Sequence, residues 1–228
     1  MFYLIETKKQ LNQLQKELLS SNLPYIDFIY GNDNTHPALA EIIAIYLNLN
    51  KESYIIPLNH LECINQDRDI IFEGLSNFNF CVLDKKAALH AAPHIPYTDI
   101  QHTIPLLDTH TTQAHAWYYR KFPHTKVNKM IPIGKHLERC EAKLRAIIDC
   151  SPENTNDYYN STLLPVLCEL EKNTLKFNDK FDNYFTPKCK KFSIKEDHIY
   201  GWYNPYTTTG RPVNNFNGIN FVGLKHDN

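Results

Sequence analysis

The sequence has no excess of charge of either sign, and this limits the classes of function that it can serve. Its 228 residues carry 24 Lys and Arg against 25 Asp and Glu, a formal net charge of −1. Dedicated nucleic-acid-binding proteins usually present a strongly basic surface, because phosphate contacts supply most non-specific affinity. The composition therefore argues against a stand-alone DNA-binding protein, but a local basic strip stays compatible with it. We expect solvated surface positions for Lys85, Lys86, Arg120, Lys121, Lys126, Lys129 and Lys135.

The cysteines and histidines lack the spacing of metal or redox sites. The six Cys are scattered and no Cys-x-x-Cys occurs, which disfavours a zinc ribbon or a redox pair and predicts reduced thiols. His90 and His94 are four residues apart, but Pro93 between them disrupts a regular helix. We therefore expect structural histidines and no cofactor bound by this chain.

Long apolar runs are missing as well. The first ten residues show no basic start followed by an apolar stretch, so they do not read as a signal peptide. No segment approaches the roughly 18 apolar residues of a membrane span. Together with the reduced thiols, these absences predict a soluble, cytoplasmic protein.

The chain does contain enough apolar sequence for a core, divided into short segments. Hydrophobic residues make up 43% of the composition. Segments rich in β-branched and aromatic residues predict strands, and apolar stripes at helical spacing predict helices. Strands are expected at Phe2–Ile5, Tyr25–Tyr30, Ile42–Leu49, Ser53–Leu58 and Phe80–Leu83, and helices at about 7–19, 67–77, from 84 onward and 134–148.

The order of these segments predicts an α/β fold with a mixed sheet flanked by helices. Three strands in a row, then a helix and another strand, indicate an antiparallel meander extended by a parallel strand. Ribonuclease H-like folds have this order. After the sheet, the sequence predicts a smaller helical and extended C-terminal part.

Four segments among the first 150 residues resemble parts of the 3′–5′ proofreading exonuclease domain of family A DNA polymerases. In the family's order they are Ser53–Leu58 (SYIIPL), Phe80–Lys86 (FCVLDKK), 114–122 (AHAWYYRKF) and the helix at 134–148. The resemblance implies that residues 1–150 form an exonuclease-like domain.

Most carboxylates that the family uses for hydrolysis are replaced in this sequence. Two-metal cleavage of a phosphodiester needs several carboxylates around ions about 3.5–4 Å apart. By the resemblance, Asp27 stands at the family's first Asp, and Ile29 replaces the Glu two residues on. In the second motif, Asp84 opens the helix and Ala88 replaces the ligand Asp. The third motif has no match near 131–138, so we expect an exonuclease fold without exonuclease activity.

The sequence changes character near residue 150. Pro152 and Asn154 mark a predicted boundary, after which Leu163–Lys176 (LLPVLCELEKNTLK) forms an amphipathic pattern. This segment resembles the helix that opens the polymerase domain of the same family. Residues 151–228 are therefore predicted to begin that domain, with at most a rudimentary thumb at about 178–200.

The segment Tyr206–Pro212 (YTTTGRP) and the side-chain amides after it form a candidate binding site. Hydroxyls, amides and a guanidinium are the groups that hold phosphate oxygens, although a polar surface loop would have the same composition. The segment resembles the Thr-x-Thr-Gly-Arg element of the family A palm, which grips the backbone of primer–template DNA. The resemblance implies DNA contacts by Thr207, Thr209, Arg211, Asn215, Asn217 and Asn220.

The palm carboxylates and fingers residues of the family have no match here. Nucleotidyl transfer requires two palm carboxylates that bind Mg²⁺, so this chain alone is not expected to synthesise DNA. We expect an N-terminal part or subunit of a phage-type family A DNA polymerase, acting in the host cytoplasm with a second polypeptide that carries palm, fingers and Mg²⁺. Two alternatives stay open: a stand-alone inactive exonuclease-like protein that binds DNA or a replisome partner, and an unrelated α/β phage protein.

Overall fold

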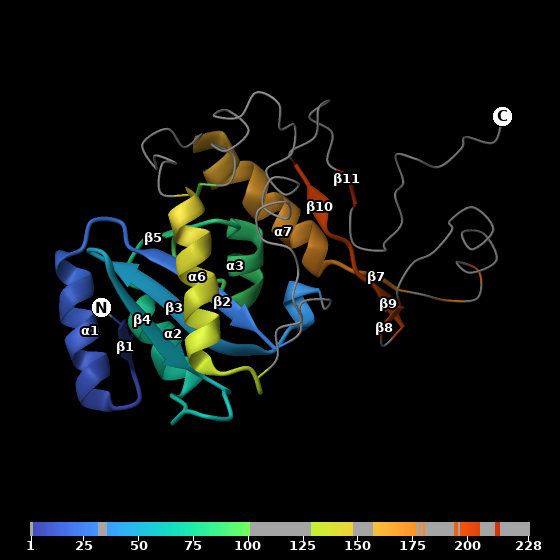
Figure 1. The fold of residues 1–228 in the computed structure, drawn as a ribbon. Helices are drawn as coiled ribbons and strands as arrows, with labels where there is room; N and C mark the ends of the chain where they lie inside the picture. Colours follow the sequence, from blue (N-terminus) through green and yellow to red (C-terminus); the bar gives the residue numbers. More distant parts are fainter. Residues whose placement is uncertain are drawn as a thin grey trace.

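A six-stranded mixed sheet with helices on both faces forms the N-terminal part of the chain (Figure 1). The computed structural model describes residues 2–31, 36–100, 129–147, 157–176, 178, 180, 194–195, 197–205 and 213–214. The sheet strands are β1 (Phe2–Leu4), β2 (Tyr25–Tyr30), β3 (Ile42–Leu49), β4 (Glu52–Pro57), β5 (Phe80–Val82) and β6 (Tyr97–Asp99). The helices are α1 (Lys8–Ser20), α2 (Arg68–Leu75), α3 (Lys85–Ala91) and α6 (Ile133–Ile147), and a 3-10 turn spans Pro37–Leu39.

The strand order confirms the predicted topology. Across the sheet it reads β1-β4-β3-β2-β5-β6. Strands β2, β3 and β4 form an antiparallel meander, β5 pairs parallel with β2, and β6 pairs parallel with β5. This meander with two added parallel strands is the ribonuclease H-like order, and β1 extends it in parallel beside β4.

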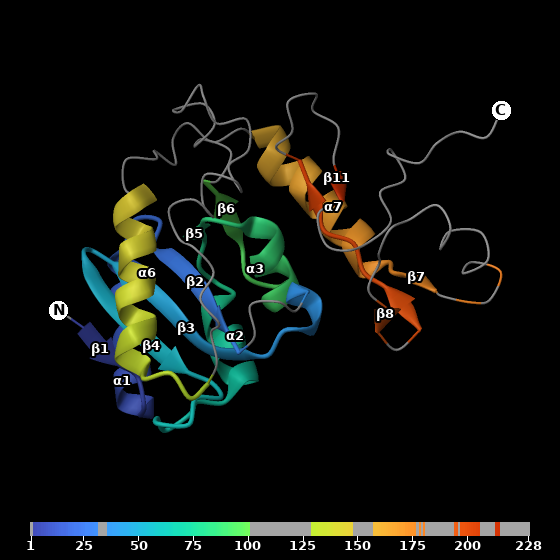
Figure 2. The same cartoon turned by 45° about the vertical axis from the view of Figure 1, so that its right-hand side comes forward.

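The two faces of the sheet bury separate apolar layers. Helices α1, α2 and α3 cover one face, where Leu14 and Ile71 pack with Phe28. Helix α6 covers the opposite face, where Cys140 packs with Tyr46 (Figure 2). Each fully buried large side chain stabilises the fold by about 1.5–3 kcal/mol, so the residues that alternate between the faces of β2–β4 supply most of the driving force.

Local sequence signals set the ends of several elements. Thr7 begins α1 with a capping box, in which its Oγ1 accepts from the Gln10 backbone N–H and its own N–H donates to Gln10 Oε1. The turn between β3 and β4 places Asn50 and Lys51 at positive φ, 50° and 72°. Positive φ at both central residues matches the twist of a tight hairpin, and Asn adopts it at low cost.

Strand β6 was not among the predicted strands. It is only three residues long and follows Pro96, so neither its length nor its composition gives a strand pattern. It forms because β5 offers an open parallel edge, on which Cys81 pairs with Thr98. Tertiary pairing therefore decides the conformation of this segment.

The C-terminal part begins with a π-helical turn at Tyr159–Leu163 that continues into α7 (Leu164–Lys172). Helix α7 packs on α3. Beyond it, β7 (Leu175–Lys176), β8 (Ile194–Lys195) and β9 (His198–Ile199) form a small sheet, and β10 (Tyr203–Asn204) pairs antiparallel with β11 (Val213–Asn214). The predicted boundary near 150 and most of the predicted thumb segment lie outside the described residues. None of the described helices is long and apolar enough to cross a bilayer.

Candidate functional site

The first predicted exonuclease position, Asp27, lies on β2 and faces α6. Its Oδ2 accepts a hydrogen bond from Lys143 Nζ at 2.7 Å, and less than a quarter of either side chain is exposed. Ile29, two residues along the same face, is buried in the apolar layer under α6. The single carboxylate at this place is therefore already neutralised by a tethered ammonium.

The second predicted position lies where β5 ends and α3 begins. Asp84 is the N-cap of α3, and its Oδ1 accepts from the Ala87 backbone N–H at 3.1 Å. Burial, with a further contribution from Asp99, raises the pKa of Asp84 to about 6 despite the nearby Lys86. Ala88 is 1% exposed within the apolar core and offers no ligand atom.

Replacing Asp84 with Asn is expected to stabilise the fold at pH 8 by about 1–3 kcal/mol. The folded pKa lies above the ordinary value of 3.8, so the charged form is penalised above pH 6 and the penalty disappears as the pH falls towards 3.8. Asn keeps the N-cap acceptor. Urea denaturation at pH 8 and pH 4 measures the difference, which should shrink to near zero at pH 4. The matched control is Asp67→Asn at the exposed N-cap of α2, where a similar gain would show that burial of Asp84 is not the cause.

The helix expected to carry the third motif carries a cation instead. Helix α6 begins at Ile133, and it meets Asp27 with Lys143, whereas Glu138 within the segment 131–138 pairs with Lys135. Burial raises the pKa of the Cys140 thiol, with a further contribution from Asp27. A protonated thiol and the Lys143 ammonium therefore face the carboxylate from α6.

A second cluster, which the sequence did not predict, lies between α3 and α7. The Glu171 carboxylate is fully buried. Its Oε1 accepts hydrogen bonds from Lys86 Nζ and, at 2.7 Å, from the Tyr203 backbone N–H. Its Oε2 lies 2.9 Å from His90 Nε2. Lys86 Nζ also donates to the Tyr203 carbonyl at 2.5 Å. We call Lys86, His90 and Glu171 the buried network.

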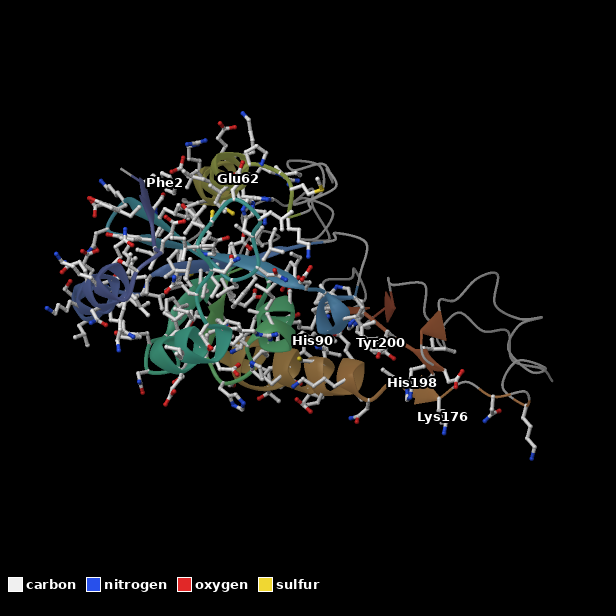
Figure 3. The ribbon with its side chains drawn as sticks, turned by 90° about the horizontal axis from the view of Figure 1, so that it is seen from below. Phe2, Glu62, His90, Lys176, His198 and Tyr200 are labelled. Atoms are coloured by element: carbon white, nitrogen blue, oxygen red, sulfur yellow. The ribbon has the colours of Figure 1, made fainter. Side chains whose placement is uncertain are left out.

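Two aromatic side chains enclose the buried network. His36 Nε2 lies 2.8 Å from the Gly201 carbonyl, and His36 Nδ1 accepts from the Ala38 N–H at 3.2 Å. The ring of Trp202 lies under Lys86 Nζ, 3.7 Å from ring centroid to nitrogen. The rings of His90 and Tyr200, labelled in Figure 3, both pack against His36, with ring centroids 5.2 and 5.3 Å from its own.

The surface expectation for Lys86 was wrong, because this residue is 3% exposed. The spacing of Lys86 and His90 places both on one side of α3, a signal that the sequence does contain. Their partner Glu171 is 85 residues from Lys86, and no local pattern reveals a pairing at that separation. Lys85 is half-buried, and its Nζ donates to the Asn160 carbonyl, in the turn before α7, at 2.7 Å.

His36, His90 and Glu171 have the composition of a metal-ligand set. Their ligand atoms lie within 4.8 Å of one another, and among the described residues no other such group of three occurs. Two His and a Glu are a known zinc ligand set. Here Lys86 already compensates the carboxylate, and both His36 nitrogens have partners within the chain.

The predicted DNA-contact residues Thr207, Thr209, Arg211, Asn215, Asn217 and Asn220 lie outside the described residues. The strands on either side of 205–212 are described, and Tyr203 pairs with Asn214. Strands β10 and β11, which we call the hairpin, therefore pair on either side of residues 206–212, and β10 adjoins the buried network through Tyr203.

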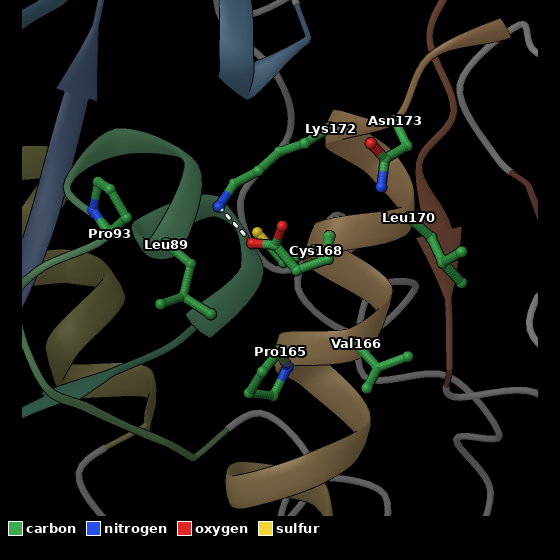
Figure 4. Close-up of a pocket in the computed structure, with 9 residues that line it drawn as sticks. Leu89, Pro93, Pro165, Val166, Cys168, Leu170, Lys172 and Asn173 are labelled. Carbon is green, nitrogen blue, oxygen red and sulfur yellow. Dashed lines mark hydrogen bonds and ion pairs between the residues drawn. The ribbon is translucent and has the colours of Figure 1, made fainter.

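An apolar cavity of about 380 Å³ lies between α3 and α7. Leu89 and Pro93 line it from the α3 side, and Pro165, Val166 and Leu170 line it from α7 (Figure 4). The exposed ion pair of Lys172 with Glu169 lies at its rim, 2.6 Å between Nζ and Oε1. The charged side chains that line the cavity, Glu169 and Lys172, are paired with each other.

No known protein family profile matches the sequence, and no curated protein matches it. Among solved structures, the EXO domain of Nibbler from Aedes aegypti aligns with a TM-score of 0.43 and 14% identity, over 73% of this chain and 95% of that one. The catalytic core of RRP6 from Trypanosoma brucei aligns with a TM-score of 0.44 and 11% identity, over 75% of this chain and 51% of that one. The POL domain of Pol1 from M. smegmatis, solved with DNA primer-template and dNTP, aligns with a TM-score of 0.47 and 13% identity, over 83% of this chain and 36% of that one. This chain thus spans about half and about a third of the latter two.

Proposed function

We propose that this chain is part of a phage-type family A DNA polymerase and comprises a non-catalytic exonuclease-like domain followed by the beginning of the polymerase domain. The observation that carries the proposal is the ribonuclease H-like strand order combined with apolar side chains at Ile29 and Ala88 and an ion pair between Asp27 and Lys143. The three resemblances in the sequence, which follow the family's order from residue 53 to residue 220, support the polymerase assignment.

The chemistry at Asp27 supports the proposed loss of proofreading. Two divalent ions need several oxygen ligands, because one carboxylate neither balances nor spaces two double charges. Ile29 and Ala88 contribute only carbon atoms, and Lys143 contributes a positive charge to the same carboxylate. A divalent ion would have to displace that ammonium, and of the three positions 27, 29 and 88 only Asp27 would offer it a side-chain ligand.

Purified chain is expected to leave single-stranded DNA intact with Mg²⁺ or Mn²⁺, to the same degree as its Asp27→Ala variant. The readout is the length distribution of a labelled oligonucleotide on a denaturing gel. Cleavage that Asp27→Ala abolishes would refute an inactive exonuclease, because it would require metal ions to assemble around that carboxylate.

The proposed DNA contact is tested at Arg211. Arg211→Ala should weaken binding to primer–template DNA similarly for different sequences and reduce the slope of log affinity against log salt by about 1, because one phosphate contact is lost. Lys8→Ala on α1 removes the same charge far from the hairpin and is the matched control. Equal behaviour of the two variants would remove the proposed role of Arg211.

Synthesis would require palm and fingers residues supplied by another part of the polymerase or by a second polypeptide. Those residues would bind Mg²⁺ and the incoming nucleotide, and this chain would contribute primer–template contacts. Addition of a palm-and-fingers polypeptide should restore dNTP incorporation on a primed template. Co-purification without incorporation would instead favour a stand-alone scaffold protein.

A further inference from the structure

Helix α3 occupies the place of the family's second catalytic motif, yet its polar side chains serve another purpose. Ala88 turns into the apolar core, whereas Lys86 and His90 turn towards α7 and the chain before β10. Lys85 reaches the Asn160 carbonyl, and the Lys86 carbonyl faces Cys168 Sγ at 4.0 Å. The contacts of Lys85, Lys86 and His90 described here therefore all join α3 to residues after 157.

We propose that the exonuclease-like domain is retained as an anchor, in which Lys86 and Glu171 position the hairpin that carries the Thr-Gly-Arg segment. They are positioning residues, because they act on DNA only through the backbone of β10. The inference rests on the proposed function, since it assumes that Thr207, Thr209 and Arg211 contact DNA.

The anchoring is specific because both polar groups of one residue are fixed. The Tyr203 N–H donates to Glu171 Oε1, and the Tyr203 carbonyl accepts from Lys86 Nζ. One residue earlier, the Trp202 ring lies against the same ammonium, and one residue before that, the Gly201 carbonyl bonds to His36. Residues 201–203 are therefore held by side chains from α3, from α7 and from the turn before β3.

The charges make this arrangement all-or-none. Glu171 and Lys86 are both almost fully buried, and a buried charge without its partner is strongly unfavourable. The Tyr203 backbone groups complete the hydrogen bonding of both ions, so the pair is satisfied only when β10 is docked. Docking of the hairpin base and burial of the ion pair are thus one event.

A zinc ion is the rival occupant of this cluster, because two imidazoles and a carboxylate converge there. Binding it would put three positive charges next to one carboxylate in a buried site. It would also take one His36 nitrogen away from its partner in the chain, either the Gly201 carbonyl or the Ala38 N–H. The geometry favours the Lys86 ammonium as the permanent cation of the cluster.

The test measures hydrogen exchange at the backbone amides of residues 201–203 and affinity for primer–template DNA in the full chain. The variants are Lys86→Met and Glu171→Gln. The control is Glu169→Gln, which removes the exposed ion pair with Lys172 on the same helix (Figure 4). Circular dichroism reports whether each variant is folded. If Lys86→Met or Glu171→Gln does not fold, Trp202→Leu is measured in its place, because it keeps both charges of the pair.

Faster exchange at 201–203 together with at least several-fold weaker DNA binding, both absent in Glu169→Gln, is the expected result. Unchanged exchange overturns the anchor. If exchange is faster, DNA affinity is unchanged and Arg211→Ala still weakens DNA binding, the positioning role is overturned. If Arg211→Ala also leaves DNA binding unchanged, the proposed DNA contact itself has failed. Saturable binding of Zn²⁺ that His90→Ala abolishes would assign the cluster to a metal instead.

Discussion

Glu171→Gln is expected to lower the free energy of unfolding by about 3–5 kcal/mol, because it leaves the Lys86 ammonium buried without a counter-charge. A glutamine oxygen in the place of Oε1 can still accept from Lys86 Nζ and from the Tyr203 N–H, but the side chain carries no charge, and a donating amide nitrogen replaces the oxygen that meets His90. For a domain of ordinary stability this is a large fraction of the total. Urea denaturation at pH 7.5 gives the measurement through the midpoint and slope.

A double variant separates the charge from the packing. Lys86→Met combined with Glu171→Met removes both ions and should be more stable than Glu171→Gln alone, since no uncompensated charge remains. The Tyr203 N–H still loses its acceptor, which costs about 1–3 kcal/mol. A cost below about 1 kcal/mol for Glu171→Gln would mean that the pair is hydrated and not truly buried.

Acid is expected to destabilise the protein through His36 by about 2–3 kcal/mol. Burial lowers the pKa of His36 to about 4, against an ordinary 6.5; His90 and Lys86 lower this pKa further, whereas the Gly201 carbonyl and Glu171 raise it in part. The folded state therefore binds fewer protons than the unfolded chain between these values. Stability is fully present above pH 6.5 and is lost as the pH falls towards 4.

His36→Gln isolates this contribution. The stability difference between the native chain and the variant should fall by about 2–3 kcal/mol from pH 7.5 to pH 4, because glutamine does not titrate. Asp84 acts in the opposite direction over pH 4–6, so the native chain alone should show a shallow profile. A constant difference across the range would mean that His36 takes up its proton without disturbing the Ala38 and Gly201 contacts.

The sheet was predictable because its central strands are long and rich in β-branched residues. Tyr25–Tyr30 and Ile42–Leu49 have the predicted bounds, and buried strands of this composition leave little choice of period. Helix starts at Thr7 and Asp84 followed from side-chain caps. The three-residue β6 and the paired C-terminal strands depend on an open neighbouring edge, which no local pattern encodes.

The sequence pointed to Asp27, Ile29, Asp84 and Ala88 only through a resemblance, and that Ile29 and Ala88 replace ligands stays a prediction. The structure buries Ile29 and Ala88 in apolar layers. The contact of Lys143 with Asp27 could not be predicted, because α6 is more than one hundred residues from β2 and its register on the sheet is set by packing. The buried network has the same origin, since Glu171 looks like one more polar position on an amphipathic helix.

Two carboxylates of this fold have a cation of the chain itself as partner, Lys143 at Asp27 and Lys86 at Glu171. A cation bonded to the chain is present at fixed stoichiometry and does not dissociate. Chelators and swings in divalent ion supply should therefore leave both acidic positions compensated and the thermal midpoint unchanged. The contacts of Tyr203 with Lys86 and Glu171 would therefore stay assembled whether or not a divalent ion is supplied.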